Sequence, residues 1–252
     1  MKFRHILSKG TGKRVVISPQ DEMMKNSLKQ MFRAVEVSQV EEALRMVREN
    51  EADVLVQGNI TIPEFFKILE GEGVKKENLC FTLVFEDLIR GKLLFLADAY
   101  IHDFPSLEEK IGICRELVDF VKLFGIKPKV AALAAIETVN PAIRSTVDAA
   151  VLSKMSHRGQ IDAEVEGPLD IDSALSKVAA KRKGVDNEVS EDVDVLLCPD
   201  IESTFALCHF LTEVGKFPAA GVLLGAEPIV IHPRFIPNKN KAVEVALSAL
   251  RH

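Results

Sequence analysis

Short apolar runs alternate with segments of helical periodicity along most of the chain. The runs RVVIS at 14–18 and ADVLV at 52–56 are typical of buried strands, because they hold few polar positions. Residues 20–33 and 39–49 instead repeat apolar positions at the spacing of one helix face. Two strand–helix units in series favour a parallel sheet, and therefore the α/β class.

The pattern changes between residues 77 and 101. Two apolar runs, ENLCFTLVFED at 77–87 and RGKLLFLADAYI at 90–101, face each other across Leu88–Gly91. Since a connection this short joins antiparallel neighbours, we expect a hairpin that interrupts the parallel order. The switch is also a candidate domain boundary.

Alternating strands and helices are expected from there to the end of the chain. Ser106 and Glu109 match a capping box, in which a serine accepts from the helix backbone and a glutamate reaches back, so they predict a helix to about Phe124. The other expected elements are a similarly capped helix from Thr61 to about Leu69, strands at 129–135, 193–197, 219–225 and 228–231, and helices at about 141–155 and 170–182, within 199–208, and from about 238.

Composition and charge exclude some classes of function. The chain has 252 residues, of which 47% are apolar, so one large domain or two small ones can bury a core. A net charge of −5 gives no general attraction to nucleic acid or to an anionic membrane, so an anionic ligand must be held by local geometry. The longest apolar stretch, VAALAAI at 130–136, is too short to cross a bilayer.

The N-terminus and the cysteines indicate a cytoplasmic protein. Residues 1–14, MKFRHILSKGTGKR, are basic but lack the long apolar core of a signal peptide. The four cysteines form no CxxC pair and have no histidine at ligand spacing, so we expect small buried residues in a reducing compartment. They are Cys80, Cys114, Cys198 and Cys208.

Polar residues follow nearly every expected strand, at the place where ligands collect in open α/β folds. Residues at strand ends are also common turn formers and helix caps, and this alternative stays open for each of them. Arg234 is the strongest candidate, because a guanidinium group is a rigid fork for phosphate; the alternative is a surface ion pair. The candidate groups are Ser18–Pro19, Gln57–Asn59, Asp98–Asp103, Glu137–Asn140, Asp200–Glu202 and Pro233–Arg234.

Other chemistries find little support. The six histidines never occur at metal-ligand spacing, and no GxGxxG sequence follows a strand, so a metal centre and nicotinamide chemistry are not expected. The basic run Lys181–Lys183 is interpreted as a solvated helix end, with a contact to a ligand phosphate as the alternative.

The stretch PKVAALAAIETVNPAIRSTVDAAVLSKMSHRGQIDAEVEGPLDID at 128–172 resembles the phosphate acetyl/butyryltransferase family, and its butyryl branch most of all. ADVLVQG, LLFLADA, VDVLLCPDIES and AAGVLLGAEPIVI follow in the order of the family, so the resemblance covers most of the chain from about residue 14. It implies a two-domain, three-layer αβα fold like that of isocitrate and isopropylmalate dehydrogenases, with a mostly parallel sheet. The implied first domain is 1–84 plus 225–252, and the second, 85–224, contains the hairpin, with the active-site cleft between them.

The resemblance also implies a reaction. The family transfers a short acyl group, butyryl or acetyl, between coenzyme A and inorganic phosphate, with an acyl phosphate on one side. Such a reaction needs a cationic clamp for phosphate, donors for the thioester oxyanion and a base for the thiol proton. No catalytic metal or tightly bound cofactor is expected. The expected partners are acyl-CoA and phosphate, with no nucleic acid or membrane, in a homodimer or larger homo-oligomer.

Several positions depart from the pattern of the family. The family tends to have lysine at Gln57, asparagine at His102, a Gly-Asn pair at Thr204–Phe205 and a Ser-Arg pair at Pro233–Arg234, so the arginine alone survives. The residues after it read FIPNKN and hold no carboxylate that could act as a base before Glu244. We expect Thr204 and Phe205 to reshape or fill the loop PDIEST and to weaken its phosphate site.

Two functions therefore stay open. The first is an acyltransferase, in which Arg234 clamps phosphate, His102 acts as acid or base, and Glu137 and Asn140 line the acyl or phosphate site. The second is a non-catalytic relative that binds CoA or acyl-CoA or acts as a structural or regulatory partner. The predicted catalytic residues are Arg234, His102 and Glu137, and the predicted substrate-binding residues are Gln57, Asn140, Asp98, Asp200, Glu202, Thr204 and Phe205.

Overall fold

The computed structural model forms two compact units. Unit 1 comprises Met1–Leu79, Val84–Lys92 and Lys216–His252, and unit 2 comprises Cys80–Leu83 and Leu93–Gly215. The residues described are 2–10, 12–17, 26, 28–30, 32–56, 62–71, 73–226, 229–230, 241–248 and 250.

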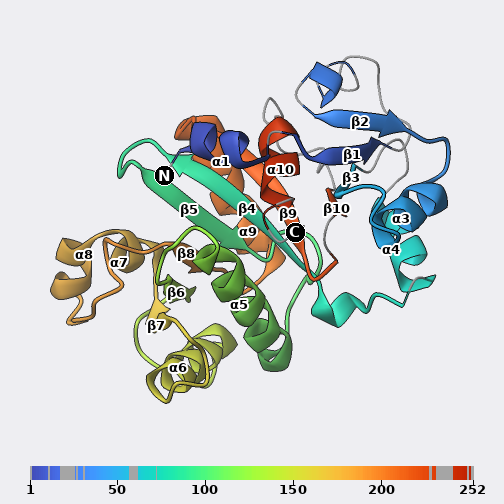
Figure 1. The fold of residues 1–252 in the computed structure, drawn as a ribbon. Coiled ribbons are helices and arrows are strands. Elements are labelled where there is room, and N and C mark those ends of the chain that lie inside the picture. Colours follow the sequence, from blue (N-terminus) through green and yellow to red (C-terminus); the bar gives the residue numbers. More distant parts are fainter. Residues whose placement is uncertain are drawn as a thin grey trace. The chain divides into compact units, whose positions relative to one another are not determined.

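A four-stranded parallel sheet with strand order β10-β3-β1-β2 lies in unit 1 (Figure 1). Alternate residues of its central strands, Val15 and Ile17 of β1 with Val54 and Val56 of β3, face one core together with Val245 of α10. The elements of unit 1 include α1 (Phe3–Gly10), β1 (Arg14–Ile17), β2 (Arg33–Glu36), α3 (Val40–Arg48), β3 (Val54–Val56), α4 (Ile62–Gly71), β9 (Ala219–Leu224), β10 (Ile229–Val230) and α10 (Lys241–Ser248).

A second sheet has six strands in the order β7-β6-β8-β5-β4-β9. Strands β5, β8, β6 and β7 run parallel, and β4 and β5 form the expected hairpin around residues 88–91 (Figure 1). The prediction of a mostly parallel α/β fold with an antiparallel hairpin is therefore confirmed. The elements between α4 and β9 are η1 (Lys76–Asn78), β4 (Cys80–Asp87), β5 (Lys92–Ala97), α5 (Leu107–Lys122), β6 (Lys129–Leu133), α6 (Arg144–His157), β7 (Glu164–Leu169), α7 (Ile171–Leu175), α8 (Lys177–Arg182), β8 (Val195–Leu197) and α9 (Ile201–His209). Helix α9 continues as a π-helical turn, Phe210–Val214.

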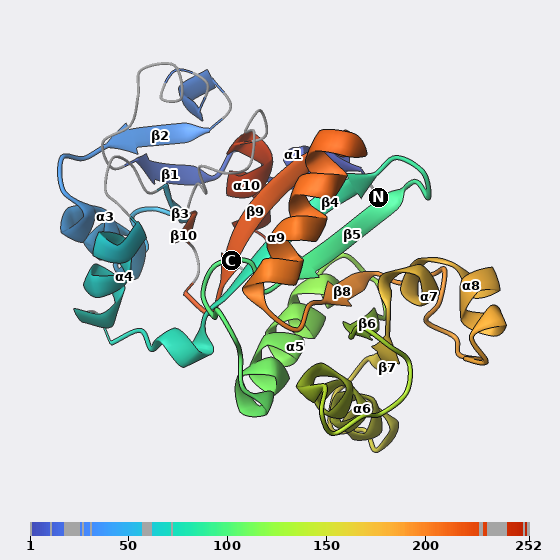
Figure 2. The same ribbon diagram turned by 180° about the vertical axis from the view of Figure 1, so that it is seen from behind.

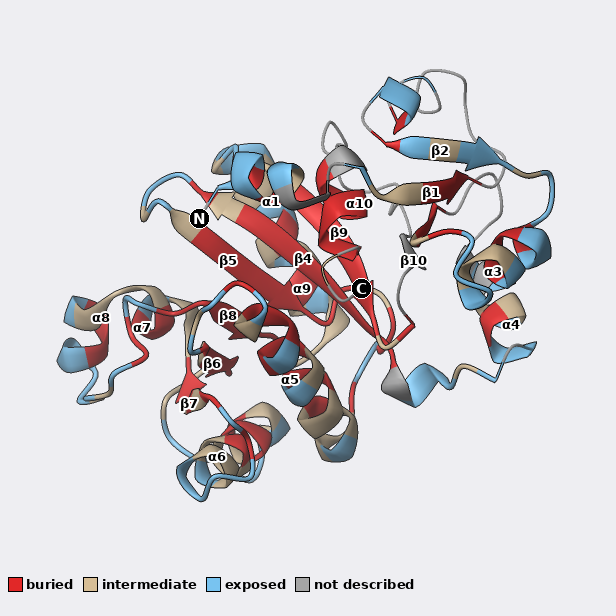
Figure 3. Cartoon of the chain, in the orientation of Figure 1, coloured by how far each residue is buried: buried red, intermediate tan, exposed pale blue. Residues whose placement is uncertain are grey.

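Helices α5 and α9 cover opposite faces of this sheet (Figures 1 and 2). The ring of Phe95 on β5 packs edge-on against Phe120 of α5, with ring centroids 6.1 Å apart. Figure 3 shows the sheet strands buried over most of their length, whereas the helices are buried on one face. This is the amphipathic pattern that the sequence periodicity predicts.

The predicted capping box opens α5. Ser106 Oγ accepts a hydrogen bond from Glu109 N, and Glu109 Oε2 accepts one from Ser106 N at 2.6 Å. Two backbone donors at the helix start are thus satisfied, which fixes the start of α5 and the position of the Glu109 side chain.

Some elements differ from the expectation. The helix expected over 20–33 does not reach Arg33, which begins strand β2; residues 28–30 are helical, and 18–25 lie outside the described residues. Strand β2 is mostly exposed, so no apolar run reveals it. Helix α1 and strand β7 were not expected; β7 holds two glutamates, a glycine and Pro168 among its six residues. The helix expected at 170–182 is two helices divided at Ser176, whose side chain caps the second.

The four cysteines are buried and free, as expected. Burial raises the pKa of the Cys114, Cys198 and Cys208 thiols to about 12 in each case. No helix within the described ranges combines the length and the apolar character that a membrane span requires.

Candidate active site at the sheet edge of unit 2

The carboxyl ends of β5, β6, β7 and β8 lie at one edge of the sheet, because these four strands are parallel. Each end leads into a segment that carries polar side chains. These are Asp98 and His102 after β5, Glu137 and Asn140 after β6, Asp170 and Asp172 after β7, and Asp200, Glu202 and Thr204 after β8. The predicted residues Gln57, Pro233 and Arg234, like Ser18–Pro19, lie outside the described residues.

The Asp98 carboxylate organises the segment after β5. Its Oδ1 accepts from Phe81 N at 2.9 Å and from Tyr100 N at 3.4 Å, and its Oδ2 accepts from His102 N at 3.0 Å. The side chain is 1% exposed. A buried carboxylate with this many backbone donors holds the segment in one conformation and ties it to β4.

The ring of His102 completes this network. Its Nδ1 lies 2.7 Å from Asp98 Oδ2. The Asp98 carboxylate accepts hydrogen bonds from the surrounding N–H groups, so we assign the tautomer of His102 that carries its proton on Nδ1. In this tautomer Nε2 has the free lone pair. The ring is 4% exposed, and its Nε2 finds no hydrogen-bond partner among the described residues. The Asp98–His102 pair therefore presents a nitrogen that can take up or release a proton.

Glu109 faces that nitrogen. Its Oε1 lies 3.9 Å from His102 Nε2, too far for a hydrogen bond but close enough for electrostatic attraction to a protonated ring. The Glu109 side chain is 35% exposed, whereas Asp98 and His102 are enclosed. The three groups form a row that leads from the protein interior toward the surface.

The loop PDIEST after β8 begins α9. The Asp200 side chain caps the helix by accepting from Ser203 N at 2.8 Å. Ile201 N donates to Asp103 O at 3.0 Å, so the loops after β5 and β8 are joined. Thr204 is fully buried, and its hydroxyl donates to Asp200 O at 2.8 Å. The Thr204 side chain therefore points into the protein. The expectation that it fills the loop is not met.

Phe205 belongs to an aromatic row. Its ring meets Tyr100 edge-on at 6.0 Å and stacks on His209 at 6.2 Å, and Tyr100 in turn meets Phe81 edge-on at 5.6 Å. Phe205 is half-buried. Its bulk thus packs along the side of α9 as well as beside the loop, and its substrate-binding role stays a prediction.

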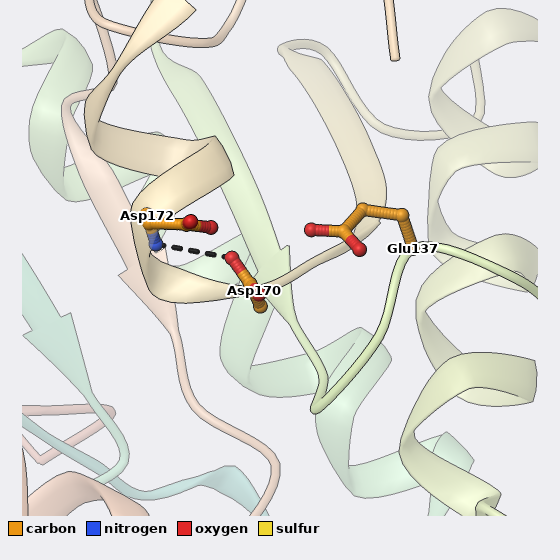
Figure 4. Close-up of side chains that lie close together, drawn as sticks. All are labelled: Glu137, Asp170 and Asp172. Carbon is orange, nitrogen blue, oxygen red and sulfur yellow. Dashed lines mark hydrogen bonds between the residues drawn. The ribbon is translucent and has the colours of Figure 1, made fainter. Parts of the chain in front are cut away.

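Glu137 lies in a second polar cluster, with Asp170 and Asp172 (Figure 4). One oxygen from each residue lies within 4.8 Å of the others, a spacing that a divalent cation can use. Lys183 contacts all three, at 3.0 Å from Glu137 Oε1, at 2.5 Å from Asp172 Oδ1, and at Asp170 Oδ2. The ammonium group offsets one of the three negative charges and gives each carboxylate a hydrogen-bond partner.

The electrostatics of this second cluster agree with its geometry. Burial favours the neutral form of Glu137, but hydrogen bonds from Ser173 and Lys183 outweigh it and lower the pKa of this carboxyl. Burial is likewise outweighed at Asp170, whose pKa is lowered by hydrogen bonds that include those from Lys183 and Ser173 N–H. The same contacts raise the pKa of Lys183, chiefly through Asp170. All three groups therefore stay charged at neutral pH.

The two remaining predicted residues differ in their surroundings. Asn140 Oδ1 accepts from Ala142 N at 3.0 Å, an arrangement typical of a turn former. Glu202 is exposed in the first turn of α9. Their substrate-binding roles stay predictions.

A surface hollow of about 460 Å³ lies between α6, β7 and residues 186–189. Burial raises the pKa of Glu166 in this hollow, and His157 opposes the shift. Acidic side chains outnumber basic ones there, which disfavours the phosphate groups of an anionic ligand. The ionisable lining residues are Lys127, His157, Glu164, Glu166, Asp186 and Glu188.

Comparison with known proteins identifies the family. The model of the family described as phosphate acetyl/butaryl transferase matches residues 14–246. The chain belongs to this family. Family membership confirms the resemblance seen in the sequence.

Individual members of the transferase family show the same relationship. A phosphate butyryltransferase of Clostridium acetobutylicum is 38% identical over 214 residues, which cover 82% of this chain and 71% of that protein. A phosphate acetyltransferase of Thermotoga maritima is 34% identical over 214 residues, or 82% and 73% of the two chains. The crystal structure of a branched-chain phosphotransacylase from Enterococcus faecalis V583 matches with a TM-score of 0.79 over 95% of this chain and 99% of that one. At 24% identity, this last match supports the fold alone.

Sequence reasoning missed the placement of four residues in this member of the transferase family. Asp170 and Asp172 follow β7, a strand that was not expected, so they could not be placed at the sheet edge. Lys183 was interpreted as part of a solvated helix end; it does end α8 at an exposed position, but it also contacts three carboxylates, which the sequence does not reveal. Glu109 was recognised as a helix cap, but its position beside His102 depends on a contact that the sequence does not reveal.

Proposed function

We propose that this protein transfers a short-chain acyl group, butyryl or acetyl, between coenzyme A and inorganic phosphate. The observation that carries the proposal is the family match over residues 14–246, together with a relative named phosphate butyryltransferase that is 38% identical. Acyl-CoA and phosphate are then substrates, and no tightly bound cofactor is needed for the chemistry.

The proposed site keeps the residues that the sequence predicts. Arg234 clamps phosphate, and His102 serves as an acid or base held by Asp98. Glu137 is proposed as the third catalytic residue. The residues proposed to bind or orient the substrates are Gln57, Asn140, Asp98, Asp200, Glu202, Thr204 and Phe205.

The decisive assay measures thiol release from acetyl-, butyryl- and longer acyl-CoAs with and without phosphate. We expect release that depends on phosphate and yields an acyl phosphate, fastest with one of the short chains. Absence of phosphate-dependent release from every acyl-CoA would contradict the proposal. A thermal shift with CoA in the same samples would then identify a protein that binds CoA without the reaction.

Arg234→Ala is the first variant for this assay. Because the guanidinium group stabilises phosphate charge in the transition state, we expect kcat/KM to fall at least about 100-fold. The free energy of unfolding is expected to change by no more than about 0.5 kcal/mol. Arg182→Ala, at an exposed position on α8, is the matched control and should keep near-wild-type turnover. Equal turnover in the two variants would exclude Arg234 as the clamp.

We also propose that the protein works in the cytoplasm as a homodimer or larger homo-oligomer. The resemblance to the family and the buried, free cysteines support this assignment. Light scattering on the purified protein measures the oligomer, and a monomer at micromolar concentration would contradict it.

A further inference from the structure

The starting observation is a buried nitrogen with unused hydrogen-bonding capacity. His102 Nε2 has no hydrogen-bond partner among the described residues, and the ring is 4% exposed. An unpaired polar atom in such a site costs stability, so this nitrogen is a candidate for a role in proton transfer. The group that faces Nε2 at 3.9 Å is the Glu109 carboxylate.

The two oxygens of Glu109 have different surroundings. Oε2 accepts from Ser106 N at 2.6 Å and completes the cap of α5, whereas Oε1 faces His102. The cap holds the carboxylate in place with Oε1 3.9 Å from His102 Nε2. Since the side chain is 35% exposed, it is the member of the row that a substrate can reach.

Other carboxylates are less suited to the same task. Both oxygens of Asp98 already accept hydrogen bonds, and its side chain is 1% exposed. Glu244, the first carboxylate after Arg234, is fully buried and accepts from Gly221 N at 3.1 Å. Glu109 thus combines exposure with a neighbouring group that can store a proton.

We propose that Glu109, His102 and Asp98 form a proton relay in which Glu109 takes the thiol proton of coenzyme A. The inference rests on the proposed function. When CoA reacts with an acyl phosphate, the S–H bond breaks and its proton moves to Glu109 Oε1, while sulfur bonds to the acyl carbon. The bond from that carbon to the phosphate oxygen breaks, and phosphate leaves with the electron pair.

Glu109 then passes the proton to His102 Nε2. The imidazolium formed lies between Asp98, at 2.7 Å from Nδ1, and Glu109, at 3.9 Å from Nε2, so two carboxylates stabilise its charge. In the opposite direction the proton returns by the same route to the departing thiolate.

Glu109→Gln is the cleanest variant, because glutamine also completes a capping box and preserves the start of α5. We expect kcat for acyl-CoA synthesis from acyl phosphate to fall about 100-fold or more, with an unchanged melting temperature. Glu108→Gln, on the same helix turn and exposed, is the matched control and should stay within about twofold of the wild type. Full activity in Glu109→Gln would overturn the relay.

A second measurement separates the relay from the proposed function. The ¹⁵N resonance of His102 Nε2 is recorded in the wild type with CoA and with desulfo-CoA, which lacks the thiol. The relay predicts that CoA moves this resonance toward the imidazolium value, that desulfo-CoA does not, and that Glu109→Gln abolishes the difference. Identical spectra with both ligands would overturn it even in an active enzyme. An inactive wild type that shows the difference would contradict the transferase proposal and keep the relay.

Discussion

Two polar clusters at the same sheet edge show how similar carboxylates come to differ. After β5, Asp98 holds an imidazole that can change its charge. After β6 and β7, Glu137, Asp170 and Asp172 surround Lys183, an ammonium group whose raised pKa keeps it charged. The first arrangement suits proton transfer, whereas the second holds one ammonium group among three carboxylates.

Burial separates the two clusters further. The side chains of Asp98 and His102 are almost fully enclosed, so each hydrogen bond there acts in a medium of low polarity. Lys183 is 29% exposed, and water screens its ion pairs. A position at a strand end therefore identifies a candidate site, but the partner and its burial decide what the site can do.

Asp98→Ala should produce the largest effect on stability. It removes the acceptor of three backbone N–H groups and of His102 Nδ1, so we expect the free energy of unfolding to fall by about 3–5 kcal/mol. Urea denaturation measures the loss. Asp103→Ala, at an exposed position in the same segment, serves as the control. A loss equal to that of the control would mean that Asp98 does not organise the loop.

Lys183→Ala tests the second cluster through pH. The lowered pKa values of Glu137 and Asp170 give stability that is present above their unfolded values, near pH 4, and is lost as pH falls through the folded values. Without Lys183 the carboxylates repel each other, so the variant should be less stable than the wild type at pH 7 and approach it below about pH 4. Thermal unfolding at several pH values measures the difference. A pH-independent difference would indicate lost packing instead.

Glu202→Gln should have the smallest effect. Its exposed side chain interacts with the first turn of α9, so stability should change by no more than about 0.5 kcal/mol. The same variant assayed for phosphate-dependent thiol release sharpens the comparison. A fall in activity without a fall in stability would place Glu202 in substrate binding, whereas an unchanged activity would leave it a surface residue.

The sequence could predict the features that depend on neighbouring residues. The capping box of Ser106 and Glu109 and the hairpin of β4 and β5 are local patterns, and the structure confirms both. The strand ends that carry Asp98, Glu137 and Asp200 follow from apolar runs.

Features that depend on distant contacts could not be predicted. The Asp98 carboxylate accepts a hydrogen bond from the N–H group of Phe81, 17 residues away in the sequence. Lys183 donates one to Glu137, 46 residues away. Thr204 was expected to obstruct its loop, but a residue's identity does not tell in which direction its side chain points. In the structure the Thr204 hydroxyl donates a hydrogen bond back to Asp200 O. Strand β2 pairs in parallel with β1 without an apolar run of its own.

The buried cysteines have a practical consequence for laboratory work. A colorimetric thiol reagent reacts with thiolate, and burial both shields the protein sulfurs and raises the pKa of Cys114, Cys198 and Cys208 to about 12. In the folded protein the colour should therefore report free coenzyme A with little background. Continuous spectrophotometry without a coupling enzyme is then a suitable format for comparing the variants.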